Sequence, residues 1–205
     1  MTEEKFLALI AAGRESESLE AKPGGIRTDA LLGARVVRAA LGMANHEGGG
    51  FIVVGIEEDQ AGRFQLTGIP DANLASWNHD DVSSMINGAA EPHVSIETHA
   101  VISEGLTFVV ISVGEFVDVP VVCRKQGPVL PGGRRTHDKD VCYARSRRKP
   151  ETIDAASDAT TWRTLMDLAG TKTARKILSV VGSGVRPQPI PGDAERFADQ
   201  LGDFR

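Results

Sequence analysis

Residues 43–58 read Met-Ala-Asn-His-Glu-Gly-Gly-Gly-Phe-Ile-Val-Val-Gly-Ile-Glu-Glu, and this stretch decides the fold. The apolar run from Phe51 to Ile56 is typical of a strand that is buried on both faces. The three glycines before it predict the end of a helix, because glycine adopts left-handed cap geometry at little cost. Glu57 and Glu58 follow directly, where a strand end can present carboxylates to a cleft.

A helix is predicted upstream of the glycines. Thr28 or Asp29 can cap its start, and its apolar positions form a broad face up to about Asn45. Arg35 and Arg38 are three residues apart and therefore share a second stripe of the same helix. Two interpretations of this pair stay open: the arginines contact phosphate groups, or they form the solvent-facing side of the helix.

The segment before this helix contains the first candidate chemistry. On an extended backbone Glu20 and Lys22 point to one side, while Leu19 and Ala21 point inward. Metal-dependent nucleases use such a pair, in which the acid holds a divalent cation and the lysine offsets charge at the phosphate. Glu15 can share this site only if the chain bends between it and Glu20. Taken alone, however, such a triplet is most often an exposed pair that contributes little.

The remaining pattern predicts an α+β fold with a mixed, mainly antiparallel sheet, flanking helices and a C-terminal helical tail. Further helices are expected over about 3–12, 78–90 and 157–181, and further strands over about 18–22, 63–68, 93–102, 106–113, 120–125 and 141–145. We predict a domain over residues 1–155, a C-terminal helix over 156–181, and a linker with a short terminal helix over 182–205. That terminal helix can dock on its own domain, a second copy or a partner protein.

Composition and charge exclude several classes of protein. The chain is 41% hydrophobic and 25% charged, which is ordinary for a globular protein, and its net charge of −5 argues against a histone-like basic binder. The acidic N-terminus and the short apolar runs predict neither a secretory signal nor a membrane span, so we expect a cytoplasmic protein. Cys123 and Cys142 lack close-spaced partners and are expected to be reduced thiols.

Positive charge is nevertheless concentrated in one region. Between residues 124 and 149 only Asp138 and Asp140 are acidic, against nine basic residues: Arg124, Lys125, Arg134, Arg135, Lys139, Arg145, Arg147, Arg148 and Lys149. A solvated loop is the plainer interpretation of such a run.

Several of these stretches together resemble the signature of the Schlafen/AlbA-type nucleic-acid-binding family. The family pattern runs E-S-x-x-x-E-F-K, then a helix that ends in A-N-T-x-G-G, a strand that leads into G-V-D/E-D/E, and a closing Y-x-x-R strand. The matching stretches here are residues 15–22, 43–58 and 141–146. The sequence departs from the pattern at Ala21, where the family has an aromatic residue, and at His46, where it has threonine.

The resemblance implies roles for particular residues. Family members that cleave RNA use three acids, which correspond here to Glu15, Glu20 and either Glu57 or Glu58, beside Lys22. Glutamate stands where the cleaving relatives have aspartate as the third acid. The implied metal ligands are Glu15, Glu20 and Glu58, and the implied cofactor is Mg²⁺ or Mn²⁺. The resemblance also implies a positively charged groove, for which the candidates are Arg35, Arg38, Arg134, Arg135, Lys139, Arg145, Arg147, Arg148 and Lys149.

Three functions follow as hypotheses. The first is a divalent-metal-dependent endonuclease that acts on RNA or single-stranded DNA. The second is a non-catalytic nucleic-acid-binding or regulatory module that contacts backbone phosphates with little base specificity. The third, weaker one is a scaffold subunit that uses the tail. ATP binding is weaker still, because the triple glycine follows a helix and lacks the G-x-x-x-x-G-K-[ST] pattern.

Overall fold

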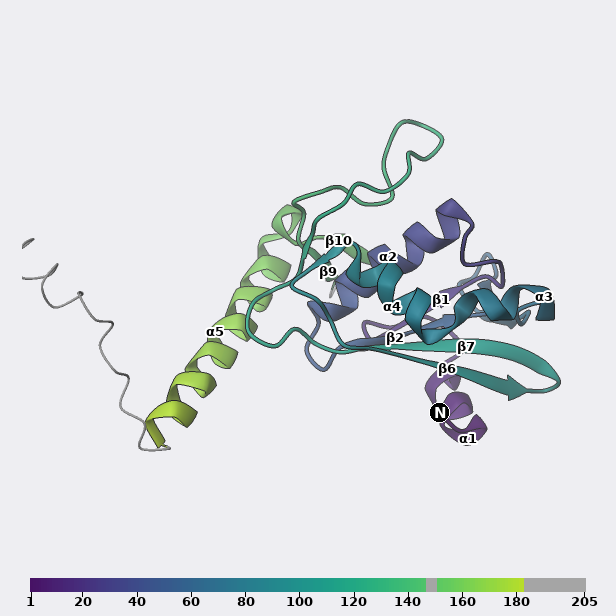
Figure 1. The fold of residues 1–205 in the computed structure, drawn as a ribbon, viewed down its shortest axis with the longest axis horizontal. Helices are drawn as coiled ribbons and strands as arrows, with labels where there is room; N and C mark the ends of the chain where they lie inside the picture. Colours follow the sequence, from purple (N-terminus) through teal and green to yellow (C-terminus); the bar gives the residue numbers. More distant parts are fainter. Residues whose placement is uncertain (147–150, 183–205) are drawn as a thin grey trace, which may run out of the picture. The chain divides into compact units, whose positions relative to one another are not determined.

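The computed structural model describes residues 1–146 and 151–182, and Figure 1 shows its ribbon. One compact unit spans Met1–Ala169, and a second begins at Gly170. The predictions for Arg147, Arg148 and Lys149, and for the linker and terminal helix after residue 182, lie outside the described residues.

A four-stranded sheet forms the centre of the first unit. Its strands are β1 (Leu19–Lys22), β2 (Gly50–Val54), β7 (Leu106–Val113) and β6 (Ile96–Ser103), in that spatial order. β1 runs parallel to β2, whereas the β2–β7 and β7–β6 pairs are antiparallel. The prediction of an α+β fold with a mixed, mainly antiparallel sheet is therefore confirmed.

Helices cover both faces of this sheet, as Figure 1 shows. α2 (Ala30–Ala44) and α4 (His79–Asn87) pack on one face, where they meet Ile52 and Val54 of β2. α1 (Glu3–Ile10) packs on the other face, where Phe6 meets Val53. β2 is thus apolar on both sides, as the run from Phe51 to Ile56 predicted.

The smaller elements surround this core. They are β3 (Ile56–Glu58), which pairs with β4 (Phe64–Leu66); α3 (Asp71–Leu74) and the 3₁₀ turn η1 (Ala75–Trp77); β5 (Ala90–Glu91), which pairs with β8 (Val122–Cys123); and β9 (Tyr143–Arg145), which pairs with β10 (Thr152–Asp154). The turn η2 (Ala155–Ser157) follows, and then α5 (Ala159–Gly182). Leu165 of α5 is buried in the core of the first unit.

The predicted strand through Ile56 is interrupted at Gly55. This residue has φ +107°, and a side chain on it would come within 2.9 Å of the Phe108 ring. Glycine is therefore required both by the backbone conformation and by close packing. The break turns β3 away from the central sheet and sends Glu57 and Glu58 along a separate hairpin.

The glycines at 48–50 also differ from the expectation. α2 ends at Ala44 with Asn45 as its cap, before the glycines begin. Gly49 has φ +73°, and a Cβ there would lie 2.1 Å from the Val113 carbonyl oxygen. This glycine is therefore required where the chain passes the end of β7, and it does not cap the helix.

The described part of the second unit is the C-terminal portion of α5, from Gly170 onward. Ile177, Leu178 and Val180 are exposed there. Among the residues that the structure describes, no helix is long and apolar enough to cross a membrane. Binding of a second copy or of a partner protein by the tail stays a prediction.

Candidate functional site

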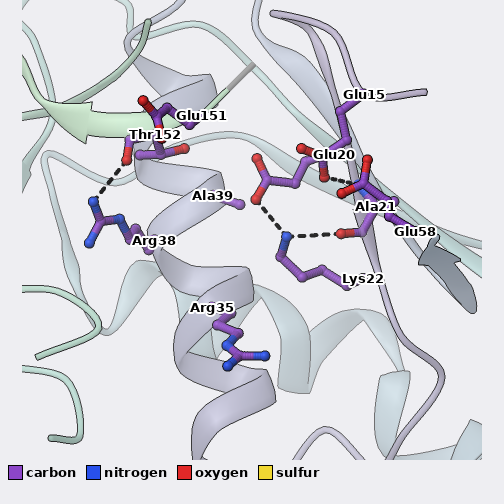
Figure 2. Close-up of a pocket in the computed structure, with 10 residues that line it drawn as sticks. All are labelled: Glu15, Glu20, Ala21, Lys22, Arg35, Arg38, Ala39, Glu58, Glu151 and Thr152. Atoms are coloured by element: carbon purple, nitrogen blue, oxygen red, sulfur yellow. Dashed lines mark hydrogen bonds and ion pairs between the residues drawn. The ribbon is translucent and has the colours of Figure 1, made fainter. Parts of the chain in front are cut away.

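Three of the predicted acids and the predicted lysine line one pocket of about 360 Å³, shown in Figure 2. The residues around it are Glu15, Glu20, Ala21, Lys22, Arg35, Arg38, Ala39, Glu58, Glu151 and Thr152. The sequence left open whether Glu57 or Glu58 joins the other acids. Glu58 lines the pocket and Glu57 does not. We call this cavity the acidic pocket.

A tight bend brings Glu15 back beside β1, as a shared site requires. The Ser16 N–H donates to the Leu19 carbonyl at 3.0 Å, and the Leu19 N–H donates back at 3.4 Å. The Glu15 Oε1 atom accepts a hydrogen bond of 2.9 Å from the Ala21 N–H. Glu15 and Glu20 therefore face the same cavity although five positions separate them.

Glu20 lies between two cations. The Lys22 ammonium is 2.5 Å from Glu20 Oε1, and the Arg145 guanidinium donates to Glu20 Oε2. Lys22 also donates to the Ala21 carbonyl at 2.9 Å. An ammonium has three N–H donors, so one donor of Lys22 is left over after these two bonds.

Arg145 contacts residues that line the pocket but is not itself part of the lining. Its side chain is fully buried, and it donates to the carbonyls of Ser16 at 2.7 Å and Glu17 at 3.0 Å. It also donates to the Thr152 hydroxyl at 3.2 Å. Arg145 was predicted as a groove residue, but its observed partners are the acidic bend and Glu20. Arg145 therefore holds Glu20 and the acidic bend in place.

The acids in the pocket affect the protonation of Glu15. Burial raises the pKa of the Glu15 carboxyl from 4.5 to about 7, with further increases from the negative charges of Glu20 and Glu58. The Lys22 charge and the hydrogen bond from Ala21 lower this pKa in part. Near neutral pH Glu15 is therefore present in both the protonated and the charged form.

The carboxylates do not form a ready metal site in this arrangement. Among the described residues, no three carboxylate, imidazole or thiol groups have the spacing that would hold a metal ion. Both oxygens of Glu20 already face cations, and one oxygen of Glu15 accepts a backbone N–H. Metal ligands must also be deprotonated, which the raised pKa of Glu15 opposes. The observed geometry therefore does not fit the Mg²⁺ or Mn²⁺ site that the resemblance implied.

A second pocket of about 620 Å³ adjoins the first. It is lined by Arg38, Gly133, Arg134, Arg135, Asp138, Val141, Tyr143, Glu151, Thr152, Ile153, Asp154 and Ser157. Arg38, Glu151 and Thr152 line both cavities, so the two adjoin at these residues. Because Arg134 and Arg135 stand on its wall, we call it the basic pocket.

The other predicted cations are placed differently. Arg35 is exposed on α2 and lines the acidic pocket. Arg38 lines both pockets, but its two terminal nitrogens donate to the carbonyls of Thr136 and Thr152, each at 2.8 Å. Lys139 lies 3.8 Å from Asp140 and lines neither pocket.

Sequence analysis did not identify three pocket residues that follow the basic run at 124–149. Glu151, Thr152 and Asp154 line the pockets, and β10 pairs with β9 to place them there. The short alternation Glu-Thr-Ile-Asp at 151–154 is the signal that could have revealed them, because it directly follows a predicted strand and a short loop.

Comparison with known families identifies the domain. The sequence matches the family described as Schlafen, AlbA_2 over residues 15–154, which is more than half of the chain. The chain belongs to the Schlafen AlbA_2 family. Domains of this family often bind nucleic acid. The match begins at Glu15 and ends at Asp154, so it includes every residue of the acidic pocket.

Two solved structures are similar to this Schlafen AlbA_2 chain. The DIP2311 protein from Corynebacterium diphtheriae is 20% identical, with a TM-score of 0.45, over 74% of this chain and 25% of that one. The N-terminal domain of a RecG-related protein from Nitrosomonas europaea is 23% identical, with a TM-score of 0.47, over 65% of this chain and 86% of that one. No curated protein matches the sequence.

Proposed function

We propose that this chain binds RNA or single-stranded DNA through backbone phosphates, along the acidic and basic pockets. The observation that carries the proposal is that the two cavities adjoin at Arg38, Glu151 and Thr152. A strand that follows this path meets Lys22 and Arg35 in the first pocket and then the two arginines of the second. Cations therefore line both pockets, where successive phosphates of one strand can contact them.

The electrostatics favour a local and salt-sensitive interaction. The chain has a net charge of −5, so attraction to nucleic acid arises from the groove and not from the whole surface. Lys22 keeps a donor beyond its bonds to Glu20 and Ala21, and Arg35 is exposed. Contacts to phosphates release counterions and carry no base information. Binding is therefore expected to weaken with salt and to depend little on sequence.

Cleavage of the bound strand is the second candidate function. The convergence of Glu15, Glu20, Glu58 and Lys22 on one cavity favours it, because a surface that only binds phosphate gains nothing from adjacent carboxylates. In this candidate Lys22 would offset charge at the phosphate, and Mg²⁺ or Mn²⁺ would be the cofactor. The metal requires a rearrangement of the acids, since the observed geometry does not hold it.

Binding and cleavage are separated by one set of experiments. Fluorescence anisotropy with labelled single-stranded RNA and DNA, at several salt concentrations, measures binding. Wild-type binding that Arg134→Ala/Arg135→Ala weakens supports the proposal, and no binding to either strand at low salt would overturn it.

The same oligonucleotides, incubated with Mg²⁺ or Mn²⁺ and with a chelator, report cleavage. The test variant is Glu15→Gln/Glu58→Gln. Glu57→Gln is its control, because it replaces the neighbouring glutamate of Glu58 outside the pocket. Metal-dependent cutting that is lost only in the test variant establishes the nuclease. Tight binding without cutting leaves a binding module.

A further inference from the structure

A hairpin forms one wall of the basic pocket. Residues 127–137, which we call the basic hairpin, are joined by hydrogen bonds from Gly127 N–H to the His137 carbonyl (2.8 Å), from Thr136 N–H to the Pro128 carbonyl (3.0 Å) and from Leu130 N–H to the Arg134 carbonyl (2.6 Å). Gly132 and Gly133 form its turn, with φ +96° and +83°. Arg134 and Arg135 therefore lie on the returning arm of an ordered hairpin.

Arg38 connects this hairpin to the body of the domain. Its Nη1 donates to the Thr136 carbonyl and its Nη2 to the Thr152 carbonyl, each at 2.8 Å. Its guanidinium carbon lies 4.9 Å from the centre of the Tyr143 ring. One planar group on α2 thus joins the hairpin, β10 and β9. A lysine ammonium cannot reproduce this, because it lacks the planar fork and stacks poorly on a ring.

A second contact from the hairpin reaches α2. His137 is buried at the base of the hairpin and hydrogen-bonds to the backbone of Ala34. It lies at the last position of the hairpin, whereas Thr136 is next to Arg135. Loss of the Arg38 contact therefore loosens the arm that carries the arginines while the base stays attached.

We infer that Arg38 is a positioning residue, which holds the basic hairpin so that Arg134 and Arg135 face the same strand as the acidic pocket. This inference rests on the proposed nucleic-acid binding. Arg38 lines both pockets, yet its terminal nitrogens are engaged by protein carbonyls. Its contribution to binding therefore comes through the hairpin, and Arg35, one turn earlier on α2, has no such contact with the hairpin among the described residues.

The salt dependence of binding tests this role. Each lost phosphate contact lowers the slope of log Kobs against log salt by about 0.7 for a single strand. Arg134→Ala/Arg135→Ala is therefore expected to lower the slope by about 1.4. Arg38→Lys keeps its charge but releases the hairpin, so we expect a similar loss, and no further loss when all three substitutions are combined. Arg163→Lys, at an exposed position outside both pockets, is the matched control and is expected to leave the slope unchanged.

A second variant, Gly127→Ala, disturbs the contact between Arg38 and Thr136 at Thr136. A Cβ on Gly127 would lie 2.1 Å from the Thr136 hydroxyl oxygen and 2.7 Å from the His137 ring. Gly127→Ala therefore displaces Thr136 while Arg38 stays intact, and it is expected to lower the slope as Arg38→Lys does. If Arg38→Lys fails to fold, a slope that Gly127→Ala leaves unchanged would overturn the inference.

Hydrogen exchange separates failure of the inference from failure of the proposed function. In Arg38→Lys the amides of Leu130 and Thr136 are expected to exchange faster, while those of Gly127, β2 and β7 keep their protection. An unchanged slope with unchanged exchange would overturn the positioning role, and so would losses that add to those of Arg134→Ala/Arg135→Ala. If the wild-type protein binds no strand, the proposed function fails, and the exchange rates still decide whether Arg38 holds the hairpin.

Discussion

Arg145 and Glu20 form an ion pair across 125 positions of sequence, and the Arg145 side chain in this pair is fully buried. The same guanidinium donates to the carbonyls of Ser16 and Glu17. Arg145 therefore fastens the acidic bend to β9, and the shape of the acidic pocket depends on it. The buried arginine of β9 therefore has a structural role in this chain.

Arg145→Met is expected to lower the free energy of unfolding by about 3 kcal/mol or more, because removal of one partner of a buried pair leaves the other charge uncompensated. Two backbone carbonyls lose their donor as well. Urea unfolding measures the change. Arg35→Met is the control, and its effect should stay within about 0.5 kcal/mol because Arg35 is exposed. A loss below about 1 kcal/mol in Arg145→Met would show that Arg145 does not anchor the bend.

Asn45 binds β9 at Tyr143, the end opposite Arg145. Its amide nitrogen donates to the carbonyls of Val121 and Tyr143, each at 2.7 Å, and its amide oxygen accepts from the Val121 N–H at 2.7 Å. Asn45→Ala leaves these buried groups unsatisfied and is expected to cost about 2–4 kcal/mol in chemical denaturation. Asn73→Ala, for which the described residues show no side-chain hydrogen bond, should change stability by less than about 0.5 kcal/mol. Equal effects of the two substitutions would contradict this role.

The sequence predicted the local parts of the site better than the distant ones. Alternation along β1 correctly placed Glu20 and Lys22 on one side, because strand geometry repeats every two residues. The need for a bend before Glu20 was also correct. The partners of Arg145 and Arg38 were not predictable, because most of them are backbone carbonyls and the fold brings them from remote segments. Spacing shows which face a side chain occupies, and it does not show what will cover that face.

The sequence predicted one strand through Ile56, but β2 ends at Val54, just before Gly55. Gly55→Ala is expected to destabilise the domain by about 2 kcal/mol or more, because φ is +107° and the new methyl would meet the Phe108 ring. Gly62→Ala is the matched control: φ is +71°, but no atom lies within 4 Å of its Cβ position, so only the cost of the backbone conformation, about 1 kcal/mol, remains. Thermal and urea unfolding of both variants tests the difference, and equal losses would show that the contact with Phe108 is unimportant.

The carboxyl of Glu15 makes the stability of the domain depend on pH. Its pKa is about 7 in the folded protein and 4.5 in the reference state, so between these values the folded state binds more protons than the unfolded one. Stability due to this group is therefore complete below pH 4.5, falls as the pH rises toward 7, and is lost above 7.

Glu15→Gln removes this dependence and keeps an oxygen that can accept the Ala21 N–H. The variant should match the wild type near pH 4.5 and exceed its free energy of unfolding at pH 8 by about 1–2 kcal/mol, a value reduced for the partial exposure of the group. Urea unfolding at pH 5, 6.5 and 8 gives the comparison. Glu57→Gln, exposed and outside the pocket, serves as the control and should show no such trend. A difference between Glu15→Gln and wild type that stays constant with pH would mean that Glu15 titrates as an ordinary surface carboxyl, and that neither its burial nor the neighbouring acids raise its pKa.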